Sequence, residues 1–559
     1  MALFPNSNAS IFDEKDRDIQ QQMENFYQKS IEWNQAFWYE ADLDTRFEVG
    51  DQSVFNDIYN IPATRRKQFS FNRIRPIINM ITGYQRRNRK STVVVPIENG
   101  DQETADQFSK MMMWLARDQG VADTISSAFT GACVTGMNLM QIWMDYRRDP
   151  VNGDIRIDHC PYNSFMIDPY FRKPDLSDCN AIWKRSFLSR EAVKSLLPGK
   201  EDLLNEISSY GLEDGKFQFL PETFRFDYKN LLTYDEYYYR TYRKQKLLVD
   251  TQTGQTYEWA SSKEKNLKEF LKLYPQITVS ESEVPTVKLA IVVQGKVAYH
   301  DINPVGIDSY PFVPVLGYYN PQTPYYEWRI QGVVRGLRDA QFIYNRRKII
   351  ELDMAESQIT SGWIYKEDAL INPKDVFLAG QGKGLALKKG AQMTDVQQIR
   401  PPDIPQSFFQ LSQSLTTEIQ QIAGVNEELL GSAIDDKAGI LAMLRQGAGL
   451  TTLQRLFDQL DFSQKLLGRL LIETIQKNFS PAKVKRIIEQ EPTQEFYNHT
   501  FGRYDAAVEE GFDTTTQKQV QFAQLLHLKE VGVPIPDEVL LNAATVQNKT
   551  EITKAMEQQ

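Results

Sequence analysis

The order of segments in the second half of the chain constrains its fold more than any other feature. Glu327–Thr360 lacks proline, and its apolar residues recur at steps of three and four, which predicts a long helix packed on another helix. Ser361–Pro405 follows, with glycine and proline residues around short β-like pieces. A second helix is expected at Gln406–Ala423, a loop at Gly424–Lys437 and a very long helix at Gly439–Asn478. We therefore expect long helices on both sides of a small β-containing excursion.

The first half of the chain mixes helical and strand patterns. Helical spacing marks Phe12–Tyr39, Asp101–Asp118 and Val121–Met137. From Leu139 to Tyr319 the chain changes to alternating, β-branched and aromatic runs between turn-forming residues, which predicts strands. The tyrosine run Tyr237–Tyr239 lies in one such strand, where its rings either pack as a sheet face or offer bases a stacking surface. The fold class predicted from both halves is α+β, and a chain of 559 residues is expected to form two or more domains or one elongated multi-layer body.

The composition and motifs limit the chemistry of the chain. The sequence has no GxxxxGK[ST] phosphate loop, no HExxH zinc motif and no GxSxG nucleophile elbow. Its four histidines are scattered, and three cysteines without a CxxC pair predict no disulfide framework and folding in a reducing compartment. The N-terminus does not read as a signal peptide, and no apolar run reaches the roughly 18 residues of a membrane span. We expect no catalytic site, no metal and no cofactor.

Five strings in the sequence resemble one known family. In chain order they are FNRIRPIINMITGYQRRNR, GVVRGLRDAQFIYNRRK, IAGVNEELLGS, AGILAMLRQGAGLTTLQRLFDQL and FGRYDAAVEEGFDTTTQKQVQFAQLLHL. Together with the order of helices and excursion, they resemble bacteriophage portal proteins, also called head-tail connectors, and in particular the short-tailed (podovirus-type) branch. No string is a catalytic signature, so the resemblance depends on their number and order. It spans most of the chain and is weakest between Asp145 and Tyr319.

This resemblance implies a portal fold with long stem and wing helices, a β-containing wing and clip, and a short helical crown. The implied parts are a wing at 1–326, a first stem helix at 327–360, a clip at 361–405, a second stem helix at 406–424, a tunnel loop at 425–437, a long wing helix with a return to the wing at 438–511, and a crown at 512–559. The implied assembly is a homo-oligomeric ring of about twelve subunits, closed by head-to-tail contacts.

The resemblance also implies a role and a set of partners. The ring would sit at one capsid vertex of the virion, after assembly in the bacterial host cytoplasm, and double-stranded DNA would be packaged and ejected through its channel. The implied partners are the terminase large subunit, the major capsid protein, the scaffolding protein and the tail adaptor protein, with no membrane. A net charge of −9 suits a conduit, because many tight phosphate contacts would stall moving DNA.

Two sets of basic residues are candidates for contacts with DNA or protein partners. Ile58–Ile97 contains nine basic residues and no acidic one. This segment either packs on acidic residues of the same ring or contacts DNA or the capsid directly. Its candidate residues are Arg65, Arg66, Lys67, Arg86, Arg87, Arg89 and Lys90. In the implied clip, Lys383, Lys388 and Lys389 either face the DNA or the packaging motor, or are solubilising surface lysines.

The implied tunnel loop is the third candidate site. Its candidate residues are Asn426, Glu427, Glu428, Gly431, Ser432, Asp435, Asp436 and Lys437. In one interpretation the loop projects toward the channel axis, and its carboxylates keep phosphates from adhering. In the other, Asp435 or Asp436 only caps the following helix and the loop never meets DNA. Adjacent carboxylates of this kind could also bind a metal, but on a loop they are more often solvated.

Two other classes of function compete with the portal hypothesis. A DNA-processing enzyme would need a metal-binding carboxylate cluster or a phosphate loop, and neither is visible in the sequence. Another structural virion protein, such as a tail or internal ejection protein, would not be expected to have the order helix, excursion, helix, loop and long helix. The sequence therefore favours a non-enzymatic portal subunit.

Overall fold

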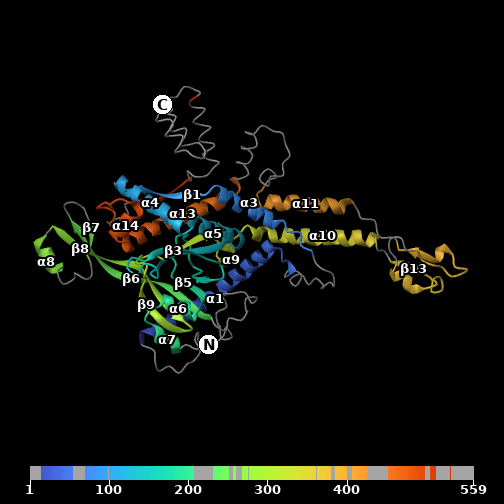
Figure 1. Cartoon of the computed structure of the whole chain (residues 1–559), viewed down its shortest axis with the longest axis horizontal. Helices are drawn as coiled ribbons and strands as arrows, with labels where there is room; N and C mark the ends of the chain where they lie inside the picture. The colour runs from blue at the N-terminus through green and yellow to red at the C-terminus, as the bar shows by residue number, and fades with distance from the viewer. Residues whose placement is uncertain are drawn as a thin grey trace. The chain divides into compact units, whose positions relative to one another are not determined.

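The structure is a computed structural model. It describes residues 14–53, 69–97, 100–206, 231–250, 256–259, 267–274, 276–359, 362–378, 384–399, 406–425, 451–497, 504–510 and 529. The chain divides into two compact units. The first unit comprises Met1–Asp42, Asn79–Val333 and Gln454–Gln559, and the second comprises Leu43–Ile78 and Val334–Leu453. The helices and strands together give the expected α+β class (Figure 1).

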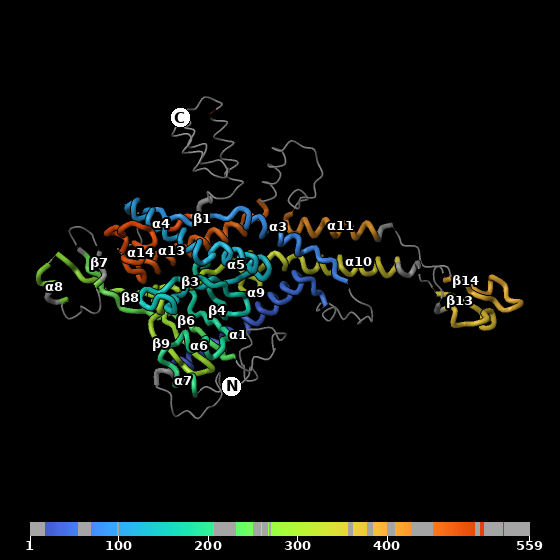
Figure 2. Tube along the Cα trace, in the orientation of Figure 1, coloured from blue at the N-terminus to red at the C-terminus, as the bar shows by residue number. Residues whose placement is uncertain are grey.

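A six-stranded antiparallel sheet forms one part of the first unit. Its strands follow the order β4-β5-β6-β8-β9, with β7 paired to the far end of β6. They span Phe165–Ile167 (β4), Ala181–Ser189 (β5), Leu231–Asp250 (β6), Thr256–Trp259 (β7), Ile277–Val293 (β8) and Lys296–Ile302 (β9). The short helices α6 (Arg190–Leu196), α7 (Glu201–Glu206) and α8 (Leu267–Leu273) accompany it. Figure 2 shows β6 and β8 continuing as a ribbon toward β7 and α8.

The tyrosine run of β6 belongs to the core of this sheet. All three rings are buried, and Tyr237 and Tyr239 stack at 5.5 Å on the same face, since alternate residues of a strand point the same way. Tyr238 points to the other face and meets Phe312 edge-on at 5.0 Å. The interpretation of the run as a packed sheet face is therefore confirmed, and these rings offer no surface for stacking bases.

A second, three-stranded sheet has the order β10-β2-β3, with strands at Phe312–Leu316, Met137–Asp145 and Asp154–Cys160. Helix α4 (Gln102–Asp118) begins at an N-cap where the Asp101 carboxylate accepts the backbone N–H of Thr104, as expected for this residue type. Helix α5 (Val121–Thr135) packs on the sheet. It ends two residues before the predicted Met137, because Gly136 adopts a φ of +98° and the chain enters β2.

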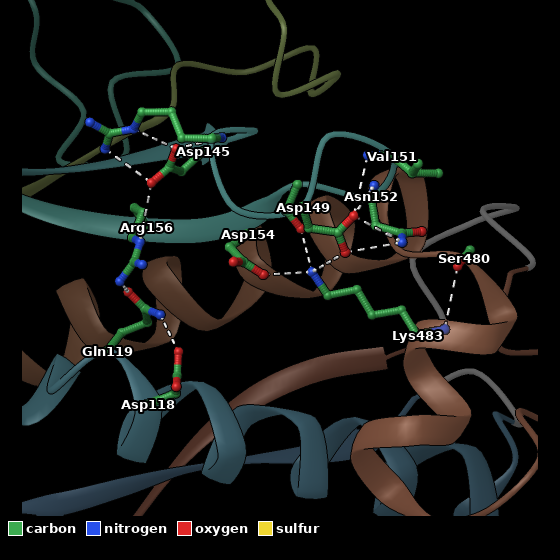
Figure 3. A network of polar contacts seen from close by, with 12 residues as sticks. Asp118, Gln119, Asp145, Asp149, Val151, Asn152, Asp154, Arg156, Ser480 and Lys483 are labelled. Atoms are coloured by element: carbon green, nitrogen blue, oxygen red, sulfur yellow. Dashed lines mark hydrogen bonds and ion pairs between the residues drawn. The ribbon is translucent and has the colours of Figure 1, made fainter. Parts of the chain in front are cut away.

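The tip of the β2–β3 hairpin is fastened to helix α14 (Pro481–Ile488), as Figure 3 shows. Lys483 has 1% of its side chain exposed; its Nζ lies 2.8 Å from an oxygen of Asp154 and 3.9 Å from one of Asp149. It also donates to the carbonyl of Gly153. The Asp149 carboxylate accepts the backbone N–H groups of Val151 and Asn152, which closes the turn.

Helix α13 (Gln454–Asn478) packs on a two-stranded sheet of β1 (Lys90–Pro96) and β15 (Tyr504–Glu510). The helix predicted at Gly439–Asn478 is interrupted by a turn at Thr452 and Leu453, so α13 begins only at Gln454. Residues 439–450 lie outside the described residues. Gly468 makes this packing possible, since a Cβ there would lie 2.4 Å from the Cβ of Ala506.

The second unit contains two long helices, α10 (Arg338–Ile359) and α11 (Gln406–Ile422), which lie side by side in Figure 1. The end of α1 (Glu14–Val49) and the start of α3 (Ile74–Arg87) complete it. The excursion between α10 and α11 contains β13 (Trp363–Tyr365), β14 (Val396–Gln398) and the 3-10 turns η5 (Pro373–Leu378) and η6 (Met393–Asp395). The helix expected at Gln406–Ala423 is confirmed. Among the β-like pieces expected within Ser361–Pro405, the one at Val376–Gly380 falls partly in η5 instead of a strand.

The predicted helix at Glu327–Thr360 was wrong in its first third. The chain there forms α9 (Tyr326–Arg329), β12 (Ile330–Gln331, paired with β11 at Tyr318–Tyr319) and the 3-10 turn η4 (Val334–Leu337) before α10 begins. Gly332 explains the difference: a Cβ there would lie 2.1 Å from the carbonyl oxygen of Val134. The backbone therefore packs directly on the end of α5, and the apolar spacing reflects contact with the core instead of a helix face. Likewise α1 continues ten residues beyond the predicted Tyr39, to Val49.

Candidate functional site

The paired helices of the second unit are joined by a buried polar contact. Ser412 of α11, with 1% of its surface exposed, donates a hydrogen bond to the Glu351 carboxylate of α10. The Nζ atom of Lys348 lies 2.8 Å from the same carboxylate, so the negative charge of Glu351 is compensated. Leu415 and Ile419 add buried apolar contacts on α11. The pair is thus held both by packing and by one satisfied charged group.

An ionic latch fixes the start of α10 to the end of α1. We use the name for Asp44, Arg335 and Arg338. The Asp44 side chain is completely buried and lies 2.8 Å from Arg335 and 3.3 Å from Arg338. Both guanidinium groups are nearly buried, with 10% and 12% of their side chains exposed. Because Asp44 is the shared partner of both arginines, removing its carboxylate would leave two nearly buried positive charges without it.

An extended strap, residues 69–73, also crosses α10. Gln341 accepts the backbone N–H of Arg73 at 2.8 Å and donates to the carbonyl of Phe71 at 2.9 Å. One turn further on, Asn345 accepts the backbone N–H of Phe71 at 2.7 Å. Asn72 then caps α3 by accepting the backbone N–H of Ile74. Because Gln341 and Asn345 are four residues apart, they lie on the same face of α10 and hold the strap in register.

Several large apolar side chains of α10 and α11 are exposed despite this pairing. They are Ile343 and Leu352 on α10, and Phe409, Leu411 and Ile422 on α11. The excursion adds Ile364, Ile371, Met393 and Ile399. Such residues are scattered singly on many proteins, whereas here nine lie on two paired helices and the excursion between them.

The excursion has a small fold of its own. β13 pairs with β14 in antiparallel register, Trp363 opposite Gln398, and Lys366 lies 2.6 Å from Asp395. The side-chain hydrogen bond from Lys366 lowers the pKa of Asp395, and the backbone N–H of Gln392 adds to the shift. The β-like piece at Trp363–Tyr365 therefore pairs within the chain, with β14.

Of the three clip lysines, the structure describes Lys388 and Lys389, while Lys383 lies outside the described residues. Both described side chains are exposed. Lys388 lies 3.3 Å from the fully exposed carboxylate of Asp368, and an exposed pair of this kind adds little stability. Both lysines are therefore accessible to a partner.

The basic segment is divided between paired and exposed residues. Arg89 lies 2.5 Å from Asp123 and Lys90 lies 2.6 Å from Asp461, and both line a cavity of 240 Å³ against α13. Arg86 and Arg87 are exposed in the last turn of α3, where a positive charge stabilises the helix end. Arg65, Arg66 and Lys67 lie outside the described residues. Among the four candidates that the structure describes, Arg89 and Lys90 are thus packed on acidic residues of their own chain.

The tunnel-loop candidates, Asn426 to Lys437, all lie outside the described residues. α11 leads to Gly424, which has a φ of +68°, and to the buried Val425 just before the loop. Thr452 donates to the carbonyl of Gly424 at 2.6 Å, so the ends of the segment 426–450 lie close together.

Metal and thiol chemistry find no support in the part of the chain that the structure describes. No group of three or more His, Cys, Asp or Glu residues there is placed to hold a metal ion. Cys133, Cys160 and Cys179 are buried free thiols, and burial raises the pKa of Cys160 to about 11. No helix among the described segments is long and apolar enough to cross a membrane.

The sequence reasoning missed the ionic latch. Asp44 and Arg335 are 291 residues apart, and a single sequence carries no signal that pairs them. The only available hint is the spacing of Arg335 and Arg338, which places two cations on one side of a helical turn.

The described residues thus form a pair of long helices joined by a small excursion, both with exposed apolar side chains. Residues 24–559 match the family model described as phage P22-like portal protein. The chain is also similar to the portal protein of Helicobacter pylori bacteriophage KHP30, with 20% identity over 480 residues, which cover 84% of this chain and 68% of that protein. The chain belongs to the phage P22-like portal protein family. It is therefore a phage portal protein and a component of the virion, and neither name describes a catalytic activity.

Proposed function

We propose that this chain forms a closed ring at one capsid vertex, with α10 and α11 as the two stem helices of each subunit. The observation that supports this most directly is the set of exposed apolar residues on both helices. In a monomer these side chains face water, whereas in a ring each subunit can cover those of its neighbour. Double-stranded DNA would pass through the channel that the ring encloses.

The ring is tested by the mass and shape of the purified protein. Native mass measurement and negative-stain images at micromolar concentration are expected to give a ring of about twelve copies with a central channel. A chain that stays monomeric under these conditions, although folded by circular dichroism, would contradict the proposal. Resemblance to the short-tailed branch supports twelve subunits in the virion.

We further propose that residues 361–405 are the clip, which docks the terminase large subunit during packaging and the tail adaptor protein afterwards. The exposed Lys388 and Lys389, together with exposed Ile371 and Met393, supply a mixed surface suited to such contacts. Replacing Lys383, Lys388 and Lys389 by Ser is expected to reduce packaging or tail attachment. Normal yields of filled, tailed particles would assign these lysines to solubility alone.

The segment 425–437 is proposed as the tunnel loop. The proximity of Gly424 and Thr452 supports a loop that leaves one helix and returns beside it. Shortening Gly431–Ala433 is expected to leave the ring intact but to lower the retention of packaged genomes. Virions that hold full-length DNA as well as the parent would make the loop a simple connector.

The remaining roles follow from the same proposal. The wing, 1–326 with 438–511, would meet the major capsid protein and the scaffolding protein, and 512–559 would form the crown. We propose no nucleotide hydrolysis by this chain, because its sequence has no phosphate-binding loop. An ATPase activity of the purified ring that a point substitution in this chain abolishes would contradict this proposal.

A further inference from the structure

Four aromatic side chains of the first unit form a cluster at its surface. We call Trp33, Tyr170, Tyr325 and Trp328 the aromatic patch. The ring centroids of Trp33 lie 6.4 Å from Tyr170 and 6.2 Å from Tyr325, and those of Tyr325 and Trp328 lie 4.8 Å apart. Tyr170 is 63% exposed, Trp328 57% and Tyr325 47%. Trp33 thus links Tyr170 to Tyr325, and Tyr325 contacts Trp328. Three adjoining large rings that face water are costly for a subunit that remains alone.

A second aromatic layer lies directly beneath the patch and is buried. Phe37 and Tyr326 have ring centroids 5.2 Å apart, and Phe171 lies 6.2 Å from Tyr326. The two layers alternate along the chain, since Tyr170 and Tyr325 point outward and their successors Phe171 and Tyr326 point inward. Within the patch, Trp33 packs against this buried core, while Tyr170, Tyr325 and Trp328 remain exposed to water.

A buried arginine holds the patch rigid. Arg329, only 1% exposed, donates hydrogen bonds to the carbonyls of Pro169 and Phe171 at 2.8 Å and to those of Thr323 and Pro324 at 3.1 and 3.0 Å. One guanidinium therefore fastens the loop that carries Tyr170 to the loop that carries Tyr325. A preorganised aromatic surface loses little entropy when a partner binds, which is the property of interface hot spots.

We propose that the aromatic patch is a contact through which each subunit binds the neighbouring copy of this chain. The inference rests on the proposed ring. Arg338, the first residue of α10, follows Trp328 by ten residues, so the patch lies within about 35 Å of the start of the stem helix in any arrangement of the units. A neighbour that covers the apolar residues of α10 and α11 is therefore within reach of the patch.

The ring geometry also defines what the patch meets. A head-to-tail contact joins two different surfaces, so the patch would pack on another part of the neighbouring copy and not on a second patch. Double-stranded DNA is a poor occupant, because its base faces are enclosed in the stack and out of reach of exposed rings. A protein surface with apolar and hydrogen-bonding groups suits Trp and Tyr.

The test compares two double variants of the full-length chain. Tyr170→Ser with Trp328→Ser removes the most exposed rings of the patch, and Tyr242→Ser with Val151→Ser removes exposed side chains elsewhere on the first unit. Analytical ultracentrifugation over a dilution series gives the concentration at which half of the chains are in rings. This half-assembly concentration is expected to be about tenfold or more higher for the patch variant than for the parent, and within about threefold of the parent for the control.

Each other outcome has a defined meaning. Equal ring assembly by the patch variant and the control variant would overturn the proposal. Normal rings of the patch variant that fail to assemble into virions would also overturn it, because they would assign the patch to contact with another protein. A lower melting temperature of the patch variant as a monomer, without a change in assembly, would show that the patch is covered by its own chain and would also overturn it. If the parent chain forms no ring, the proposed function fails before any variant is compared.

Photocross-linking supplies an independent measurement. With Tyr170→p-benzoylphenylalanine in the purified protein, irradiation is expected to give covalent dimers in ring fractions and none in monomer fractions. The cross-linked peptide is expected to lie outside the patch. Cross-links between two patches would indicate an isologous dimer and would contradict the head-to-tail contact.

Discussion

Asp44→Asn is the substitution that tests most directly how the start of α10 is held. It keeps the size of the buried side chain but removes the negative charge, so Arg335 and Arg338 remain as two nearly buried cations. Removing one partner of a buried ion pair costs about 3–5 kcal/mol, and the low end applies because Asn can still accept one hydrogen bond. Since about 1.4 kcal/mol is a factor of ten, local opening should become roughly 100-fold more frequent.

Hydrogen–deuterium exchange of peptides covering residues 334–345 measures this opening, because amides there exchange when the junction opens. The control is Asp339→Asn, an exposed carboxylate in the first turn of α10, where the loss is about 0.3–1 kcal/mol. Exchange in Asp44→Asn within about fivefold of this control would refute the argument. A triple variant with Asp44→Leu, Arg335→Met and Arg338→Met should lose less than Asp44→Asn, since it leaves no unpaired charge.

Three further predictions concern the first unit. Gly468→Ala should lower the melting temperature, because the added Cβ would overlap the side chain of Ala506. Gly83→Ala, where no atom lies near the added Cβ, should raise the melting temperature slightly. Two shifts of the same sign would contradict this packing. The three buried thiols should not react with a thiol reagent at pH 8 in the native protein, and all should react in urea, because burial raises their pKa. The hydrogen bonds from Arg469 lower the pKa of Asp505 from its usual value. The ionised carboxylate therefore stabilises the fold above about pH 4, and this contribution is lost as the pH falls. Asp505→Asn should reduce the fall in melting temperature on the acid side of a pH series.

The parts of the fold that the sequence predicted are those fixed by local patterns. α4 begins beside Asp101, whose carboxylate caps it, and β6 and β8 follow their alternating residues. The start of α10 was not predictable in this way. Gly332 sits against the carbonyl oxygen of Val134, and that contact between distant segments overrides a helical spacing of apolar residues. Local patterns do not record which distant backbone segment will pack against a given residue.

The candidate sites show the same limit. The clip lysines, Lys388 and Lys389, could be predicted to be exposed because they follow each other next to glycine in a polar segment. The aromatic patch could not, because its rings come from residues that the chain brings together over nearly 300 positions, from Trp33 to Trp328. Nothing in a single sequence distinguishes Tyr325, which faces water, from Tyr326, which is completely buried.

The basic segment illustrates how cations of an acidic chain can be paired with carboxylates of the same chain. Arg89 and Lys90 are compensated by Asp123 and Asp461, so their charges stabilise the fold and are not free to bind phosphates. Binding to DNA strengthens with each phosphate that a protein neutralises, and the counterions released make that binding strongly dependent on salt. A conduit needs the opposite property, since DNA must move past it in both directions. A cation that is paired with a carboxylate of its own chain is less available to phosphates, while its side chain still packs in the fold. This is consistent with a net charge of −9 in a protein proposed to enclose DNA.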